Sequence, residues 1–295
     1  MIQRGKHAFL IIAHNHKEQL INLVKLLDDP LNDIYIHIDQ KVHLIDDAEL
    51  RSACQSSQIN IYRNVKVAWG AFSQIECELT LLREAIKEEH VYYHLISGVD
   101  LPIMKNEEIH KFFEKYAGKE FVHFQDRAVS KRTLDHVNYY HLLQEYTNAY
   151  SPAINRIIRG VEYALLKAQK FIRIKRWDRA YELQKGANWF SITHDLAKYV
   201  VSEEKRVHCK FSYSLSGDEL FLQTLVENSR FKDHLYLPLY NDDYQQCARL
   251  IDWKRGKPYV FQVEDYQEIV SSKAVFVRKC SYELSERILK KRQSE

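Results

Sequence analysis

Residues 92–105 read YYHLISGVDLPIMK, a hydrophobic run that stops at Ser97-Gly98, passes an acid at Asp100 and turns at Pro102. The run predicts a buried strand, and the small, acidic corner after it predicts a loop at the carboxyl end of that strand. Such loops connect elements in any fold. They also line ligand crevices, because open α/β sheets bind their ligands at the carboxyl ends of the strands.

The segments before this stretch alternate between strand and helix patterns. Strands are predicted in HAFLIIAHN (7–15), IYIHIDQK (34–41) and INIYRNVKVAW (59–69), and helices in KEQLINLVKLLDD (17–29), ELRSACQSS (49–57) and FSQIECELTLLREAIKEE (72–89). We expect the last helix to have Ser73 as its N-cap, with Glu76 completing a capping box. The alternation indicates an α/β fold with a mixed, mostly parallel sheet flanked by helices.

The second part of the chain begins with a different composition. Residues 127–185 are basic, aromatic and poor in glycine, and 155–177 have amphipathic helical spacing. Mixed structure then resumes, with a strand and helix in GANWFSITHDLAKYVV (186–201), a helix in SGDELFLQTLVENS (216–229), short strands in RLIDW (249–253), PYVFQ (258–262) and AVFVRKC (274–280), and a final basic helix. We predict one domain over 1–295, divided into a nucleotide-binding half (1–126), a basic helical insertion (127–185) and an acceptor and catalytic half (186–295).

The bulk composition narrows the class of protein. With 45% hydrophobic and 28% charged residues the chain can form a packed core, and a net charge of +3 gives little support for a nucleic-acid partner. The 19 tyrosines suit contacts with sugars or bases, although half-buried packing is the commoner role of any single tyrosine. Five scattered cysteines without a CxxC pair, and an N-terminal apolar run too short to span a membrane, predict a cytoplasmic protein.

Several motifs of other enzyme classes are absent from the sequence. There is no GxGxxG after the first strand, no GxxxxGK[ST], no HExxH and no GxSxG. No strand ends in a D-x-D pair of the kind that holds a metal in many nucleotide-sugar enzymes. The acidic pairs 28–29, 46–47 and 242–243 lie in polar stretches and are interpreted as turn residues.

Acids at predicted strand and helix ends remain as candidates for chemistry. Asp39 ends the second strand, Asp100 follows the central strand, and Asp218-Glu219 begin a helix. A carboxylate at such a place can accept hydrogen bonds from a ligand or act as a general base. Spacing alone leaves the alternative open, since aspartate also forms turns and acids favour helix starts.

The order of the segments resembles glycosyltransferase family 14, which contains the core-2/I-branching β-1,6-N-acetylglucosaminyltransferases and the peptide xylosyltransferases. The segments that carry the resemblance are IIAHN, IHIDQK, VAWGAFSQIECELTLL, YYHLISGVDLPI, GANWFSIT, GDELFLQTLVENS, LIDW and VFVRKC. They cover nearly the whole chain except about 127–180. The resemblance implies a GT-A-like (Rossmann-like) fold and a UDP-sugar donor, with inversion at the anomeric carbon and no divalent metal or other cofactor.

The resemblance also implies roles for particular residues. Glu219 corresponds to the general base, which takes the proton of the acceptor hydroxyl. Arg278 and Lys279 correspond to the cations on the diphosphate, together with Lys257, or with Arg255 if the alignment slips. The full set of implied UDP-sugar residues is Ala13, His14, Asp39, Trp69, Ser97, Gly98, Asp100, Lys257, Arg278 and Lys279, and the implied acceptor residues are Trp189, Asp218 and Trp253. For the two tryptophans a core position is the alternative, and Asp100 is expected to shape the pocket rather than to bind a metal.

Departures from the family pattern bear on location and partners. The membrane anchor, stem and disulfides of the animal members have no counterpart in this sequence, so it looks like a bacterial cytoplasmic relative. Residues 155–185 carry nine Lys/Arg against three Asp/Glu. We therefore expect peripheral contact with an anionic membrane on its inner face, and a saccharide or lipid-linked oligosaccharide acceptor. A solvated basic helix is the alternative.

Three function classes follow from the sequence. The first is an inverting, metal-independent UDP-sugar transferase with N-acetylglucosamine as the favoured sugar, followed by xylose or another UDP-sugar, acting in bacterial surface polysaccharide or glycoconjugate synthesis. The second is a carbohydrate- or nucleotide-binding relative that lost catalysis, against which the retained Glu219 and Arg278-Lys279 argue. The third, an RNA-binding protein, lacks any basic and aromatic motif of a known RNA module.

Overall fold

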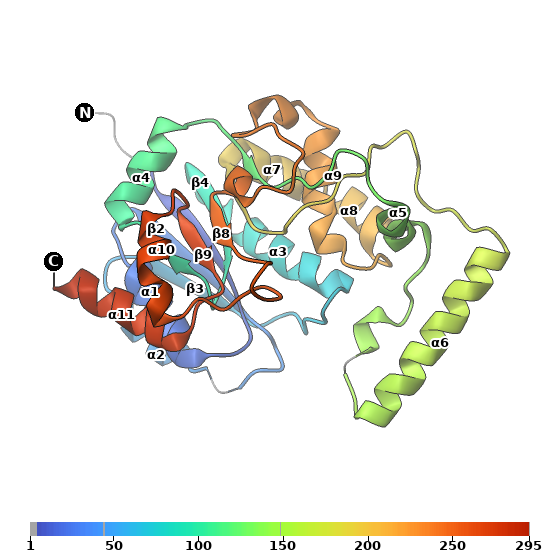
Figure 1. The fold of residues 1–295 in the computed structure, drawn as a ribbon, viewed down its shortest axis with the longest axis horizontal. Helices are drawn as coiled ribbons and strands as arrows, with labels where there is room; N and C mark the ends of the chain where they lie inside the picture. Colours follow the sequence, from blue (N-terminus) through green and yellow to red (C-terminus); the bar gives the residue numbers. More distant parts are fainter. Residues whose placement is uncertain (1–4, 44, 148, 295) are drawn as a thin grey trace.

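The computed structural model describes residues 5–43, 45–147 and 149–294, which form an α/β fold with two sheets (Figure 1). The main sheet has the strand order β3-β2-β1-β4-β7-β6. Its strands are β1 (His7–Ala13), β2 (Asn32–Ile38), β3 (Gln58–Tyr62), β4 (Tyr92–Ser97), β6 (Phe121–Val122) and β7 (Phe190–Thr193). The pairs among β1, β2, β3 and β4 are parallel, and β7 runs antiparallel to β4 and β6. The mostly parallel sheet expected of a GT-A-like fold is confirmed.

A second, smaller sheet joins the C-terminal part of the chain to the central strand. Its order is β5-β9-β8, from Leu101–Pro102, Phe276–Arg278 and Arg249–Ile251. Strand β5 follows the loop after β4 and pairs antiparallel with β9, which pairs parallel with β8. The end of β9 therefore lies beside the carboxyl end of β4.

Helices cover both faces of the main sheet. Along β1, Ala8 and Leu10 belong to one buried cluster, whereas Phe9 and Ile11 belong to another. The first cluster includes α3 (Phe72–Ala85), α7 (His194–Ser202), α8 (Glu204–Phe211) and α9 (Phe221–Glu227), and the second includes α1 (Lys17–Leu27), α2 (Asp47–Ser52) and α4 (Asn106–Lys115). Burial on both faces explains why the strands are almost continuously hydrophobic.

The remaining elements are mostly short. Helices α10 (Tyr266–Ser271) and α11 (Tyr282–Gln293) pack with the smaller sheet in a third cluster. The 3₁₀ turns are η1 (Gln144–Tyr146), η2 (Gly217–Glu219), η3 (Arg230–His234), η4 (Tyr244–Cys247) and η5 (Val263–Asp265). PYVFQ, which was expected to be a strand, contributes only an isolated bridge between Phe261 and Cys280.

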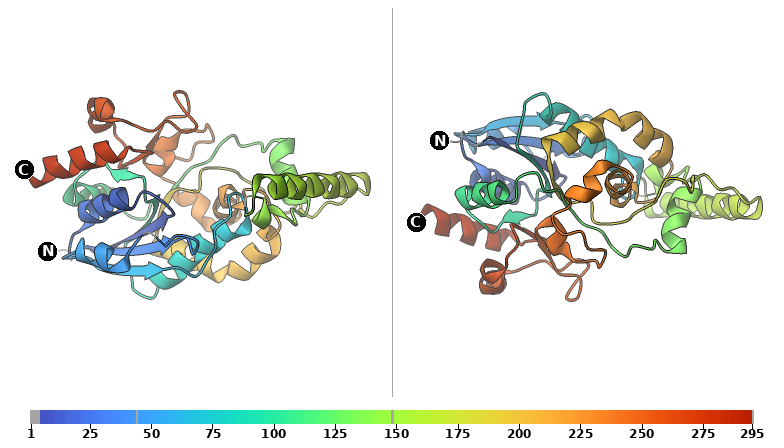
Figure 2. Two further views of the ribbon diagram at one scale, coloured as in Figure 1. Left: turned by 90° about the horizontal axis from the view of Figure 1, so that it is seen from below. Right: turned by 90° about the horizontal axis from the view of Figure 1, so that it is seen from above.

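The predicted basic helical segment is present and projects from the body. It contains α5 (Lys131–Asn138) and α6 (Pro152–Phe171), so the helix expected within 155–177 is confirmed with slightly earlier bounds. Helix α6 extends from one end of the molecule in all three ribbon views (Figures 1 and 2). The division of the chain into a nucleotide-binding half and an acceptor half stays a prediction.

The predicted capping box at the start of α3 is wrong. The helix begins at Phe72, with Ala71 as its N-cap and Ser73 inside the first turn. The side chain of Glu145 accepts hydrogen bonds from the amide (3.0 Å) and the hydroxyl (2.8 Å) of Ser73. The carboxylate that satisfies this helix start thus comes from a segment 72 residues away, which no local pattern can reveal.

The acidic pairs interpreted as turn residues have that role. Asp46 caps α2 by accepting from the amide of Ala48 (2.9 Å), and Asp243 accepts from the amide of Gln245 (2.9 Å) at the start of η4. Asp29 likewise accepts from the amide of Leu31 (2.9 Å). Hydrogen bonds to the amide two residues later are the usual reason for aspartate in tight turns. Asp28 instead accepts from three consecutive amides of a distant segment, residues 55–57.

Candidate active site

The carboxyl ends of three strands meet at one edge of the main sheet. The amide of Asp39, just after β2, donates to the carbonyl of Ala13 at the end of β1 (2.9 Å). The amide of Gly98, just after β4, donates to the carbonyl of Ile12 (2.9 Å). A β-carbon at Gly98 would lie 3.2 Å from that of Ala13, so a larger residue would crowd this junction.

Buried hydrogen bonds organise the loop after β4 around Asp100. The carboxylate of Asp100 accepts from the amide (2.9 Å) and the hydroxyl (2.8 Å) of Ser97 and is 2% exposed. Its Oδ1 also accepts from Nη1 of Arg278 at the end of β9 (2.7 Å), and the same nitrogen donates to the hydroxyl of Ser97 (2.5 Å). The acidic corner of the YYHLISGVDLP stretch therefore holds an arginine in place.

Trp189 lies against the same arginine. The guanidinium carbon of Arg278 is 3.9 Å from the centre of the Trp189 ring, a cation–π contact. Trp189 was expected among the acceptor residues, with a core position as the alternative. It is only partly buried, and its ring supports the cation that was expected to bind the donor.

The adjacent cations Arg278 and Lys279 at the end of β9 repel each other, and Arg278 forms an ion pair with Asp100 (2.7 Å). Burial lowers the pKa of the Lys279 ammonium, Arg278 lowers it further, and Asp100 opposes both. Burial also lowers the pKa of His14, Asp39 opposes this, and the charges of Lys279 and Arg278 add to the lowering. A bound anion would relieve this repulsion, so the electrostatics of these residues suit a phosphate group.

Asp39 directly follows β2, and a hydrogen bond joins it to the segment that leads to Trp69. The Oδ1 of Asp39 accepts from the amides of Lys41 (3.0 Å) and Val67 (3.4 Å), and Lys41 forms an ion pair with its Oδ2 (3.3 Å). Trp69 follows two residues after Val67 and is 71% exposed, which leaves its ring accessible to a ligand. Its carbonyl accepts from Nε2 of Gln144 (2.9 Å), a residue of the basic segment.

The structure separates the two alternatives for the third cation. Arg255 forms ion pairs with three carboxylates, those of Asp252, Asp265 and Glu268. Lys257 is exposed, and its loop is joined to the end of β9 because the amide of Lys279 donates to the carbonyl of Tyr259 (3.4 Å). These contacts favour Lys257 over Arg255 as the third cation.

Glu219, the predicted base, lies on η2 beside Lys185. Its side chain is 42% exposed, and its Oε2 is 3.1 Å from the ammonium of Lys185. Its backbone carbonyl accepts from the amide of Gly186 (2.9 Å). A β-carbon at Gly186 would lie 1.8 Å from the carbonyl oxygen of His123, so only glycine fits this close approach.

A buried acidic cluster lies behind Glu219. Burial and the charge of Glu219 raise the pKa of the Asp218 carboxyl to about 7, and Gln74 donates to its Oδ2 (3.2 Å). Burial and the charge of Asp218 raise the pKa of Glu78 well above its ordinary value, while Asn188 donates to Glu78 at 3.4 Å. Asp218 was predicted to bind the acceptor, but its side chain points into this cluster and is nearly inaccessible to solvent.

A short segment connects the cationic end of the site to Glu219. Lys185 and Gly186 contact Glu219, and Trp189 contacts Arg278. Four peptide steps separate Lys185 from Trp189, which limits their Cα–Cα distance to about 14 Å. One short segment therefore contacts both the carboxylate of Glu219 and the guanidinium of Arg278.

Two aromatic residues near Glu219, Tyr244 and Trp253, come from the C-terminal part of the chain. The ring of Tyr244 stacks on that of His123, with 4.3 Å between the ring centres. Burial raises the pKa of the Tyr244 hydroxyl, and the charge of Glu219 adds to this, whereas a hydrogen bond from Trp253 acts in the opposite direction. Trp253 is 53% exposed, so its place agrees with a sugar-contacting role better than with a core position.

Sequence reasoning missed the polar residues that lie around the Asp218-Glu219 turn and the 185–189 segment. They are Gln74 and Glu78 on α3, His123 after β6, Lys185 and Asn188 before β7, and Tyr244 on η4. Gln74 and Glu78 are one helical turn apart on α3, whose apolar spacing is the stronger sequence pattern. Lys185 was counted as one charge of a basic segment, although its neighbour Gly186 was a signal of close backbone approach.

The structure does not test the predicted independence of metal ions. Among the described residues, two groups of three side chains have metal-ligand spacing, Asp33–Glu88–His90 and Glu76–Glu204–His208. In the first, Lys6 is 2.9 Å from Asp33, and in the second Arg83 forms ion pairs with both glutamates. Cations of the protein thus already pair with Asp33, Glu76 and Glu204.

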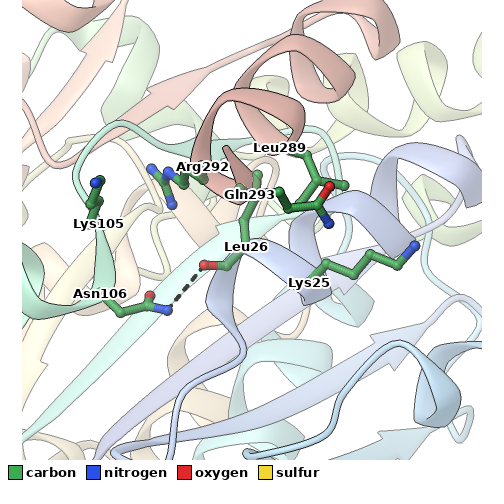
Figure 3. Close-up of a pocket in the computed structure, with 7 residues that line it drawn as sticks. All are labelled: Lys25, Leu26, Lys105, Asn106, Leu289, Arg292 and Gln293. Carbon is green, nitrogen blue, oxygen red and sulfur yellow. Dashed lines mark hydrogen bonds between the residues drawn. The ribbon is translucent and has the colours of Figure 1, made fainter. Parts of the chain in front are cut away.

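A pocket of about 300 Å³ lies away from the candidate site (Figure 3). It is lined by Lys25, Leu26, Lys105, Asn106, Leu289, Arg292 and Gln293 from the end of α1, the start of α4 and the end of α11. Helix α1 runs back from the carboxyl end of β1 to the start of β2, so its last turn lies at the opposite edge of the sheet.

Among the described residues, no helix has the length and apolar character needed to cross a membrane.

The relatives found by sequence comparison are named xylosyltransferases. Xylosyltransferase sqv-6 of Caenorhabditis briggsae is 24% identical over 300 residues, covering 93% of this chain and 34% of the relative. Xylosyltransferase 2 of Homo sapiens is 22% identical over 306 residues (96% and 32%), and xylosyltransferase 1 of Rattus norvegicus is 21% identical over 280 residues (88% and 31%). The chain thus spans about a third of the length of these relatives.

A structural comparison and a family profile complete these findings. The crystal structure of mouse xyloside xylosyltransferase 1 in its apo form matches with a TM-score of 0.37 and 9% identity, covering 92% of this chain and 96% of the mouse chain. The family profile described as "Branch: Core-2/I-Branching enzyme" matches residues 7–273, most of the chain. The chain therefore belongs to the Core-2/I-branching enzyme family.

Proposed function

We propose that this chain is an inverting glycosyltransferase that moves a sugar from a UDP-sugar to a saccharide hydroxyl in β linkage, without a divalent metal. The observation that carries the proposal is the arrangement of Glu219 and the Arg278-Lys279 pair at the two ends of the 185–189 segment. A base for the acceptor and cations for the leaving group are the two requirements of this displacement.

The proposed reaction assigns one step to each end of the site. The carboxylate of Glu219 accepts the proton of the acceptor hydroxyl while that oxygen forms a bond to C1 of the sugar. The bond between C1 and the UDP oxygen breaks, and its electron pair remains on the diphosphate. Because attack and departure occur on opposite faces of C1, the anomeric configuration inverts. A base in this position contributes a factor of about 10²–10⁴ in rate.

Protein cations take the place of a metal at the leaving group. Arg278 is held by Ser97 and Asp100 and supported by Trp189, so its position is fixed before the donor binds. Lys279 follows directly, and Lys257 is on the adjoining loop. Preorganised charges need no rearrangement as negative charge develops on the diphosphate, which is why they are effective in catalysis.

Among donors we propose UDP-N-acetylglucosamine first and UDP-xylose second. The first choice follows from the family resemblance of the sequence, and the second from the names of the relatives. Three further points stay predictions. They are an acceptor within a surface polysaccharide or another glycoconjugate, the cytoplasmic location, and the contact of residues 155–185 with an anionic membrane. A relative that binds sugars or nucleotides without catalysis is the competing function.

The test is UDP release from a panel of UDP-sugars in the presence of EDTA, with UDP binding measured by calorimetry. Glu219→Gln keeps the shape of the side chain and removes the base, so turnover should fall at least a hundredfold while UDP binding persists. Glu89→Gln, an exposed glutamate before β4 at the opposite edge of the sheet, is the matched control.

The outcomes of this experiment distinguish a metal-independent transferase from a metal-dependent one and from a relative without catalysis. Turnover that EDTA abolishes and a divalent metal restores would show that the metal-independent mechanism is wrong. UDP binding without turnover in the presence of candidate acceptors would favour the non-catalytic relative. Failure of both turnover and UDP binding would overturn the transferase proposal.

A further inference from the structure

An apolar stripe on α6 is exposed along the whole helix. Its members follow one another at intervals of three and four residues, the spacing that places side chains on one helix face. They are Ile154, Ile157, Val161, Ala164, Ala168 and Phe171. Ile157 is 67% and Phe171 87% exposed, and the helix projects from the body in every view (Figures 1 and 2).

The face of α6 that packs against the protein is another one, and much of its contact is polar. Gln169 donates to the carbonyl of Tyr140 (2.9 Å) and accepts from its amide (2.7 Å). Glu162 accepts from the amide of Leu143 (3.0 Å). Ile158, Leu165 and Leu166 on this face are only half-buried. A surface helix normally exposes polar residues on its outer face, so the second, exposed apolar stripe of α6 presents a surface suited to a partner.

The charges on α6 limit the chemistry of that partner. The helix carries four basic residues, Arg156, Arg159, Lys167 and Lys170, whereas its single acid, Glu162, faces inward. At 100° per residue, Arg156 and Lys167 fall about 100° from Ile157, on the outward side of the helix. The outward surface of α6 is therefore apolar on one side and cationic on the other.

We propose that α6 docks on an anionic membrane surface, with Ile157 and Phe171 among the acyl chains and Arg156 and Lys167 at the headgroups. Interfacial helices bind through apolar area together with attraction to anionic lipid, and this helix offers both. A second copy of the chain is a poorer match, because pairing two α6 stripes would bring Arg156 and Lys167 of both copies together while Glu162, the acid of α6, faces inward.

The position of α6 gives this contact a consequence for the candidate active site. The segment before α6 is hydrogen-bonded to the loop before α3, since Gln144 donates to the carbonyl of Trp69. The carbonyl of the next residue, Gly70, accepts from the amide of Ser216 (2.8 Å), three residues before Glu219. Docking through α6 would hold the candidate site close to the membrane, where a lipid-linked acceptor is presented.

The experiment is co-sedimentation of the full chain with vesicles of phosphatidylcholine alone or with 30–40% phosphatidylglycerol, roughly the charge of an anionic membrane. The wild type should bind only the anionic vesicles, and less strongly as salt rises. Arg156→Gln with Lys167→Gln should weaken partitioning about fivefold per charge, and Ile157→Asp with Phe171→Asp at least tenfold. These side chains are exposed, so circular dichroism should show that both variants remain folded.

Matched variants elsewhere on the surface separate the proposal from general charge and hydrophobicity. Lys198→Gln with Lys232→Gln, and Val91→Asp with Leu239→Asp, alter exposed residues outside α6 and should leave binding unchanged. The proposal is overturned if the wild type fails to bind anionic vesicles, or if the α6 variants bind as well as the wild type. It is also overturned if light scattering shows a dimer that the Ile157/Phe171 variant dissociates while vesicle binding is absent. Vesicle binding does not require turnover, so this test is independent of the proposed sugar transfer.

Discussion

Replacing Asp218 by Asn should stabilise the protein at alkaline pH while it alters the surroundings of the proposed base. The Asp218 carboxyl is buried next to Glu219 and Glu78, and its pKa is raised to about 7. Asn keeps an oxygen for the hydrogen bond from Gln74, which reaches Asp218 at 3.2 Å. The substitution removes the negative charge of the Asp218 carboxylate, which destabilises the folded state because it is buried and lies next to Glu219.

The sign and size of the effect follow from linkage. The unfolded chain releases the Asp218 proton near its ordinary value of 3.8, whereas the folded chain keeps it until about pH 7. Stability is therefore lost as the pH rises from about 4 to 7, and the loss is complete above 7. Because one pKa unit corresponds to about 1.4 kcal/mol, the full cost is roughly 4 kcal/mol, of which roughly 2–3 kcal/mol accumulates between pH 5 and pH 8.

The measurement is urea unfolding of the wild type and of Asp218→Asn between pH 5 and pH 8. Other buried groups titrate in both proteins, so the difference between the two curves isolates Asp218. We expect the variant to gain stability relative to the wild type as the pH rises. Asp126→Asn, an exposed aspartate before α5, should show a constant difference. A wild-type and Asp218→Asn difference that is independent of pH would refute the assignment of a neutral Asp218.

Three further substitutions test the supports of the site. Gly186→Ala should cost about 2–3 kcal/mol in urea unfolding, because a β-carbon would overlap the carbonyl of His123; unchanged stability would contradict that close approach. Arg249→Lys should cost about 2–3 kcal/mol in the same assay, since the buried guanidinium of this β8 residue donates to four oxygens on β4, β7 and η4, and unchanged stability would show that these hydrogen bonds contribute little. Lys185→Gln should lower kcat for UDP release about tenfold without changing UDP affinity, because Lys185 pairs with Glu219; weaker UDP binding instead would place Lys185 at the donor.

The sequence predicted the strand ends better than it predicted the walls of the site. Asp39 and Gly98 follow parallel strands, which bring their carboxyl ends to one edge, so local patterns sufficed to place these two together. Arg278 ends a strand of the smaller sheet, and only the family resemblance implied its place beside them. Glu78 and Lys185 lie next to Asp218 and Glu219 only through contacts between distant segments. No periodicity in a single sequence encodes such neighbours.

The roles of Asp100, Asp218 and Glu219 also depend on tertiary contacts. Asp100 was expected to shape a pocket, and in the structure it is a buried partner of Arg278. Asp218 and Glu219 are adjacent in sequence, yet one points into a buried cluster and the other is 42% exposed beside Lys185. A 3₁₀ turn directs consecutive side chains to different sides, which a motif written as a pair of letters does not convey.

The distribution of charge across the site is itself an argument for a two-ended reaction. At one end Arg278 and Lys279 are held together although burial and mutual repulsion lower the pKa of the lysine. At the other end Asp218 and Glu78 are held together although burial and repulsion raise the pKa of both carboxyls. Folding alone would be better served by exchanging these charges for apolar groups, since like charges brought together out of water are costly. In the proposed reaction the diphosphate of the donor would compensate the first group, and the proton that Glu219 takes from the acceptor hydroxyl would reduce the repulsion between Glu219 and the second.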